Sequence, residues 1–171
     1  MTKFATCCAA AVALFTLGAW VRAEQKDAPR PDEFLSRAME CNSIEREVAQ
    51  FAAKTATNPD VRAFAQRLAE DHTKMATKLA DTAKNLKVTL TPVPDKAARD
   101  QVAAIEKLTG KDLDQKFLAF IVASHEKALQ QIDQAAKQTK DEAVRAFAEE
   151  AAKAIRKHHE EAKELQKKLG A

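Results

Sequence analysis

Apolar residues recur three and four positions apart along most of the chain after residue 31, with charged residues between them. This spacing is typical of helices that bury one face and expose the other. It predicts four long helices over about residues 31–56, 59–86, 111–138 and 141–169, and a short one over about 95–108. Scarce glycine, abundant alanine and the absence of tyrosine also favour an all-α fold over a sheet.

The predicted helix ends coincide with residues that start or stop helices. Asn58-Pro59 separates the first two long helices, and proline is favoured at the first position of a helix. Thr91-Pro92-Val93-Pro94 interrupts the pattern after the second helix. Gly110 follows the short helix, where glycine commonly terminates a helix.

The connections between the helices predict how they are arranged. The first two long helices are joined by a few residues, as are the last two, so each pair forms an antiparallel hairpin. The longer connection between the hairpins contains the short helix and can span a long helix of roughly 39 Å. We therefore expect a ferritin-like four-helix bundle, made of two antiparallel hairpins joined by a long crossover. Val-Arg-Ala-Phe-Ala occurs at residues 61–65 and again at 144–148, which suggests a doubled hairpin.

The N-terminus has the features of a secretory signal peptide. Lys3 supplies a positive start, residues 4–20 are apolar and uncharged, and the small residue Ala23 follows. We predict a signal peptide over 1–23, a flexible segment over 24–31 and the bundle over 32–169. Retention of the apolar run as a membrane anchor is the alternative. The expected location is the periplasm or the cell envelope.

Cleavage after residue 23 lowers the formal net charge from +3 to +1. A nearly neutral chain with mixed charges gives no reason to expect nucleic acid or strong membrane-surface binding. A homodimer is left open as a partner.

Cys41 is the one cysteine left, so no internal disulfide can form. A single cysteine in a helical stripe is most often a small buried apolar residue.

Three histidines lie on the apolar stripes of three different long helices: His72, His125 and His158. We estimate how far each histidine lies from the turn of its own hairpin by counting residues. The three histidines, and Glu45 on the first helix, all lie roughly 20 to 27 Å from these turns. These four residues are therefore expected to meet in the middle of the bundle. Nearby residues expected to hold the ligands in place by hydrogen bonds to their free ring N–H groups are Asp71, Glu126, His159 and Glu161.

Three imidazoles and a carboxylate suit zinc, iron or copper. A di-iron bundle would carry Glu-x-x-His motifs, but the residues three positions before the histidines are Ala69, Val122 and Ile155. A ferritin-type di-iron centre is therefore disfavoured. His72-x-x-Met75 would present a soft sulfur to copper(I), although methionine in an apolar stripe is far more often core packing.

Two other interpretations stay open. The histidines and carboxylates would also form a metal-free buried network that fixes the helix register of a structural or interaction protein of the cell envelope. An enzyme is disfavoured, because the sequence contains no Ser/His/Asp order, no glycine-rich phosphate loop and no setting for a cysteine nucleophile. Any turnover would then depend on a bound metal.

A series of short motifs resembles the exported bacterial family of unknown function DUF4142. The most specific are Asn58-Pro59-Asp60-Val61-Arg62-Ala63-Phe64-Ala65 and Asp71-His72, followed by His125 and Ile155-x-x-His158. The resemblance covers about residues 32–168 and implies a ferritin-like bundle and export, without an established activity. The sequence departs from the family pattern at Ser124, where an acidic residue is common, and at Ala152-Lys153-Ala154, which replaces a usual Leu-Pro.

Overall fold

The computed structural model describes residues 30–91 and 93–170, and these residues form five helices and no strand. The all-α prediction is therefore confirmed. The helices are α1 (Pro31–Thr55), α2 (Pro59–Asn85), α3 (Lys96–Ile105), α4 (Gly110–Gln138) and α5 (Glu142–Leu169). The predicted signal peptide, and the predicted flexible segment up to residue 29, lie outside the described residues.

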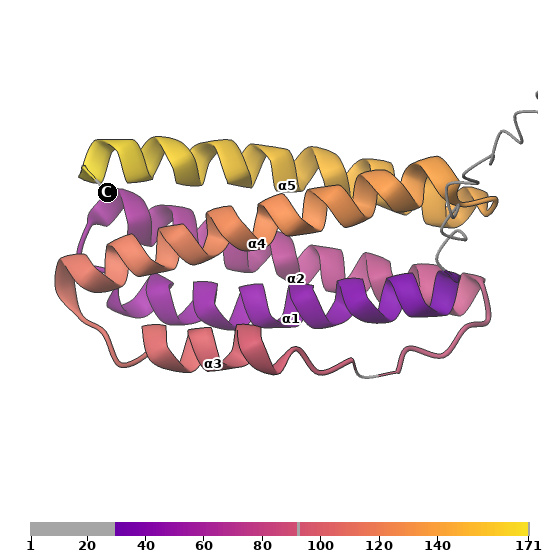
Figure 1. The fold of residues 1–171 in the computed structure, drawn as a ribbon, viewed down its shortest axis with the longest axis horizontal. Coiled ribbons are helices and arrows are strands. Elements are labelled where there is room, and N and C mark those ends of the chain that lie inside the picture. Colours follow the sequence, from indigo (N-terminus) through magenta and orange to yellow (C-terminus); the bar gives the residue numbers. More distant parts are fainter. Residues whose placement is uncertain (1–29, 92, 171) are drawn as a thin grey trace, which may run out of the picture.

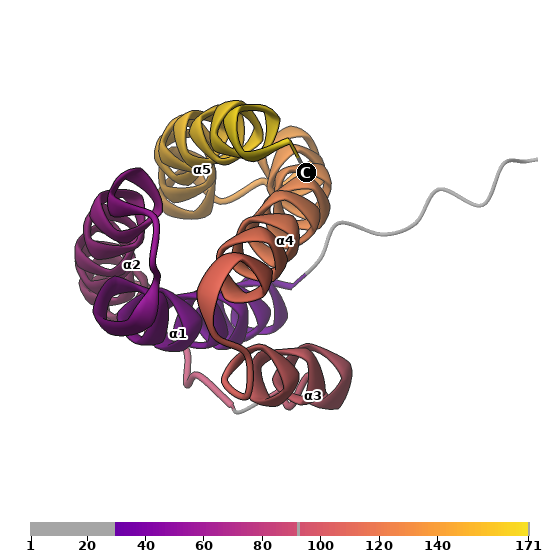
Figure 2. The same cartoon turned by 90° about the vertical axis from the view of Figure 1, so that its left-hand side faces the viewer.

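The four long helices form two hairpins, α1–α2 and α4–α5 (Figure 1). The connection after α2 runs back along the bundle, so that α4 starts at the same end as α2 and runs in the same direction. Viewed end-on, the long helices follow the order α1, α2, α5, α4 around the bundle (Figure 2). The short helix α3 lies outside this ring against α1 and α4. Each hairpin therefore meets the other along two seams, α1–α4 and α2–α5.

Side-chain caps explain where α2 and α5 begin. The Asn58 side chain accepts hydrogen bonds from two backbone N–H groups in the first turn of α2, and Asp141 does the same for α5. One prediction was wrong in detail: α3 ends at Ile105 rather than near residue 108, and Gly110 opens α4 instead of closing the short helix. Gly110 has a φ of +63°, a left-handed conformation that glycine adopts without a steric penalty.

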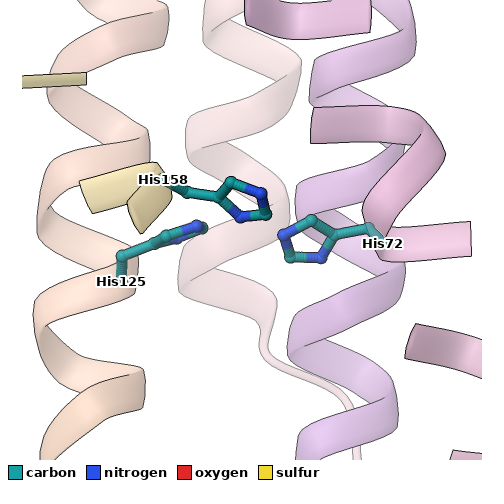
Figure 3. A group of neighbouring side chains, drawn as sticks. All are labelled: His72, His125 and His158. Carbon is teal, nitrogen blue, oxygen red and sulfur yellow. The ribbon is translucent and has the colours of Figure 1, made fainter. Parts of the chain in front are cut away.

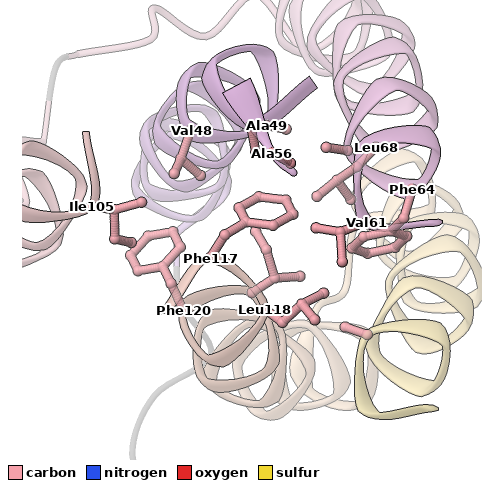
Figure 4. Close-up of a cluster of buried hydrophobic side chains, with 14 of the residues drawn as sticks. Val48, Ala49, Ala56, Val61, Phe64, Leu68, Ile105, Phe117, Leu118 and Phe120 are labelled. Carbon is pink, nitrogen blue, oxygen red and sulfur yellow. The ribbon is translucent and has the colours of Figure 1, made fainter. Parts of the chain in front are cut away.

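The buried apolar side chains form two separate clusters, one towards each end of the bundle. The first lies near the α1–α2 turn and contains Phe64 and Phe117, whose ring centroids are 6.2 Å apart (Figure 4). The second lies near the α4–α5 turn and contains Phe34 and Phe147, at 6.3 Å. The buried polar residues that lie between the two clusters in the sequences of the four long helices are Asn42, His72, His125 and His158. A polar layer thus divides the core.

Asp114 attaches α4 to the turn between α1 and α2. Asp114 is 2 % exposed, and its side chain accepts hydrogen bonds from the backbone N–H and hydroxyl of Thr57, at 3.0 and 2.7 Å, and from the backbone N–H of Asn58, at 2.8 Å. These bonds join residues more than 50 positions apart. They fix the position of one hairpin along the bundle axis relative to the other. The convergence of histidines from both hairpins depends on this position.

Candidate metal centre

Three buried histidines from three helices point toward one another in the polar layer (Figure 3). His72 of α2, His125 of α4 and His158 of α5 have ring centroids 5.6 to 5.7 Å apart. One ring nitrogen of each lies within 4.8 Å of the corresponding nitrogens of the other two. The predicted convergence of the three histidines is present in the structure.

The hydrogen bonds of Asn42 determine the tautomer of His72. The Asn42 amide Nδ2 donates to the backbone carbonyl of His72 at 2.9 Å, so its Oδ1 faces the His72 ring and accepts from Nδ1–H at 3.0 Å. In the neutral imidazole the proton is then on Nδ1. The inward Nε2 keeps a free lone pair.

Carboxylates hold the other two rings in the same manner. Glu45 Oε1 lies 3.1 Å from Nδ1 of His125, and its Oε2 lies 3.6 Å from Nδ1 of His72. Asp71 Oδ2 lies 3.2 Å from Nε2 of His158. Ionised carboxylates only accept hydrogen bonds, so each ring carries its proton on the outer nitrogen and its lone pair on the inner one.

The inner nitrogens have no hydrogen-bond partner among the described residues. They are Nε2 of His72, Nε2 of His125 and Nδ1 of His158, and all are inaccessible to solvent. Buried polar atoms normally find a partner, because leaving one unpaired costs free energy. Three acceptors that face one another cannot satisfy each other. They can be satisfied together by a cation, and neutral imidazole nitrogen is a common ligand of zinc, copper, iron and nickel.

The electrostatics of the layer favour the neutral forms of the His72 and His158 rings. Burial disfavours the charged imidazolium and, with the nearby His125 and His158, lowers the pKa of His72 from 6.5 to about 4 against the attraction of Glu45. Burial also lowers the pKa of His158, although its hydrogen bond to Asp71 opposes the shift. Burial by itself raises the pKa of Glu45, but His125 and His72 outweigh it and hold that pKa at about 2.

The metal-free protein is expected to lose stability as the pH falls through the window set by His72. The unfolded chain takes up this proton below pH 6.5, whereas the folded protein resists it down to about pH 4. The loss should reach about 3 kcal/mol at the lower limit. Glu45 adds a second loss as the pH falls from 4.5 to about 2. Urea denaturation across this range in the presence of a chelator measures the effect, and His72→Leu should flatten the upper part. An unchanged free energy of unfolding between pH 6.5 and pH 4 would contradict it.

The predicted partners of the histidines do not all contact the cluster in the structure. Asp71 contacts His158, as expected of an outer partner. Glu45 is buried in the layer, but its oxygens contact the outer nitrogens of the rings, opposite the inner donors. Among the residues that the structure describes, the other three expected partners form no hydrogen bond or ion pair with the cluster: Glu126 is exposed, His159 pairs with Glu160, and Glu161 pairs with Arg67. Asn42 was missed, although it lies three residues before Glu45 and thus on the same helix face.

Two cavities approach the histidines, one along each seam between the hairpins. The cavity of about 430 Å³ at the α1–α4 seam reaches His72 and also contacts Asn42 and Glu45. The cavity of about 300 Å³ at the α2–α5 seam reaches His158. Met75 lines both cavities. Burial raises the pKa of the Cys41 thiol, which also lines the first cavity, to about 11, so little thiolate is present at neutral pH.

A family model described as "Domain of unknown function (DUF4142)" matches residues 19–165. The chain belongs to the DUF4142 family. The resemblance stated from the motifs is therefore confirmed. The family description assigns no activity, and no curated protein matches this member.

Two solved structures share the fold of this DUF4142 protein. A putative secreted protein DUF305 from Streptomyces coelicolor superposes with a TM-score of 0.71 at 12 % identity, covering 82 % of this chain and 93 % of that one. A DUF305 fragment from Deinococcus radiodurans gives 0.70 at 14 % identity, covering 84 % and 98 %. Identities this low establish similarity of fold alone. Among the described residues, every helix is too short or too polar to cross a membrane.

Proposed function

We propose that this DUF4142 protein binds a transition metal ion through His72, His125 and His158. The observation that carries the proposal is the set of three buried inner nitrogens, which face one another without hydrogen-bond partners. A tetrahedral ion with bonds of about 2.0–2.1 Å needs nitrogens about 3.4 Å apart. The histidine nitrogens lie within 4.8 Å of one another, so only small movements of the rings are needed to reach this separation.

The outer hydrogen bonds support this role. Ligating histidines usually donate their second N–H to a carboxylate or carbonyl, which fixes the tautomer and makes the free nitrogen a better donor. Asn42, Glu45 and Asp71 provide one such acceptor for each ring. We therefore assign Glu45, expected from the sequence as a ligand, to this outer position.

We further propose that the protein is an exported, ferritin-like bundle. Two antiparallel hairpins joined by a crossover along the bundle support the ferritin-like description. The sequence of residues 1–23 supports export to the periplasm or cell envelope. The DUF305 protein from Streptomyces coelicolor is itself described as a putative secreted protein.

Elemental analysis of protein purified without a histidine tag tests the metal proposal. We expect close to one transition metal ion per chain, or stoichiometric uptake of zinc, iron or copper by chelator-treated protein, with a rise in the unfolding temperature. Substoichiometric metal after incubation with each ion, together with an unchanged unfolding temperature, would overturn the proposal.

A metal-free structural network is the second candidate. It is favoured by Asn42, which bonds both the ring and the backbone of His72 and so locks α1 against α2 without any ion. In this case the layer serves the helix register of a structural or interaction protein of the envelope. It differs from the metal proposal in expecting no ion-dependent stabilisation.

A further inference from the structure

The two hairpins carry equivalent anchors at their turns. Arg62 donates to the carbonyl of Ala56, at the end of α1, and Arg145 donates to the carbonyl of Thr139, at the end of α4. Both arginines belong to the repeated Val-Arg-Ala-Phe-Ala segment and follow equivalent capping residues, Asn58 and Asp141. Each equivalent pair is separated by the same 83 positions, so the two hairpins share one register.

Residues at this separation occupy equivalent positions in the two hairpins, and this applies to residues of the polar layer. His125 of α4 corresponds to Asn42 of α1, and His158 of α5 corresponds to Met75 of α2. Asn42 lies in the layer, where it contacts His72. Met75 therefore holds the position on α2 that, in the other hairpin, places a ligating ring at the centre.

Other observations place Met75 beside the centre. It lies three residues after His72, on the same face of α2. It is half-buried, and it lines both the cavity that reaches His72 and the cavity that reaches His158. Its side chain thus lies at the edge of the histidine layer, between the two cavities that reach this layer. An unbranched methionine side chain can reorient there without moving the helix.

We propose that the sulfur of Met75 is the fourth donor of the centre and that the centre is selective for copper(I). This inference rests on the proposed metal site. Three histidines leave one position of a four-coordinate ion unfilled, and both oxygens of Glu45 contact the outer nitrogens. Thioether sulfur is a soft ligand that favours copper(I) over zinc.

The charge of the layer also favours a monovalent ion. Three imidazoles and a thioether are all neutral donors, and Glu45 is the buried carboxylate that contacts the rings. Copper(I) with this one carboxylate leaves the buried layer electrically neutral. A divalent ion would leave a net positive charge there, because the Asp71 side chain is 42 % exposed and its charge is already paired with Lys74. Uncompensated charge in a buried site is costly.

Copper(I) binding to the full mature chain, supplied anaerobically against a chromophoric copper(I) chelator, tests the inference. The test variant is Met75→Leu, and the matched control is Met39→Leu, which alters a half-buried methionine packed against the same apolar cluster. We expect Met75→Leu to weaken copper(I) binding by at least the roughly 10-fold lost when an outer partner of a ligand is removed. Zinc affinity should change little in either variant. X-ray absorption should detect a copper–sulfur bond in the wild type and Met39→Leu but not in Met75→Leu.

The outcomes separate this inference from the proposal on which it rests. Copper bound by nitrogen alone in the wild type, with equal affinities in all three proteins, overturns the role of Met75 and leaves the histidine site standing. Absence of any stoichiometric ion overturns both. The absorption spectrum of the wild-type complex needs no variant, so impaired folding of Met75→Leu would not prevent the test. Leucine and methionine are close in volume, and we expect the variant to fold.

Discussion

Replacing His158 by leucine is expected to remove the metal-dependent part of the protein's stability. An ion that binds only the folded state stabilises it by about 4 kcal/mol when its free concentration is 1,000 times the dissociation constant. Loss of one histidine ligand should abolish most of this gain. His158 is the best histidine to replace, because its outer partner Asp71 is partly exposed and remains solvated without it. Replacing His125 would instead leave the buried Glu45 without its hydrogen bond.

The measurement is urea denaturation of each variant with added metal and with a chelator. His159→Leu is the matched control, since His159 is adjacent in the sequence but pairs with Glu160 outside the cluster. In chelator, His158→Leu should unfold at nearly the wild-type urea concentration, because an apolar side chain fits the buried site. Equal metal-induced stabilisation in His158→Leu and wild type would exclude His158 as a ligand. Absence of metal-induced stabilisation in the wild type would favour the metal-free network.

Replacing Asp114 by alanine is expected to destabilise the protein by about 3 kcal/mol, since the lost bonds are charge-assisted and partly buried. The change removes the acceptor for two backbone N–H groups and one hydroxyl at the α1–α2 turn. No other attachment of this kind holds α4 to that turn among the described residues. Metal affinity should fall as well, because the height of His125 on α4 depends on this attachment.

Asp112→Ala is the control for Asp114→Ala. Asp112 lies in the first turn of α4, two residues before Asp114, but is exposed, so its loss should cost only the few tenths to 1 kcal/mol of a charge near a helix N-terminus. Equilibrium denaturation by urea in chelator measures both variants. Similar stabilities for the two would show that the Asp114 bonds do not anchor the hairpins.

Much of the fold could be predicted because helices have strong local signals. The three-and-four spacing identified all five helices, and the Asn58-Pro59 and Asp141 positions marked two helix starts closely. The end of α3 was less predictable, because Leu108 continues the apolar spacing although the helix stops at Ile105. Leu108 instead packs against the apolar cluster from the connecting segment. Tertiary packing therefore decided that boundary.

The site was predicted less completely, because a neighbouring position in the sequence is not a neighbouring position in space. Successive helical residues point about 100° apart, since a turn holds 3.6 residues. Glu126 and His159 are adjacent in the sequence to histidines of the cluster and yet lie outside it. Asn42, 30 positions from His72, contacts it directly. The spacing of three between Asn42 and Glu45 was the available signal. An asparagine on a helix face of mixed polar and apolar residues can have many other roles, however.

By itself, the sequence determined that the chain forms amphipathic helices paired in hairpins, and that three histidines face inward at similar heights. Periodicity and helix rise are local properties, so they can be read along the chain. Only the tertiary structure decided which nitrogen of each ring faces the centre, and that Glu45 stands behind the rings. Those features depend on hydrogen bonds between different helices. The three inner lone pairs, and with them the case for a metal, follow from that packing.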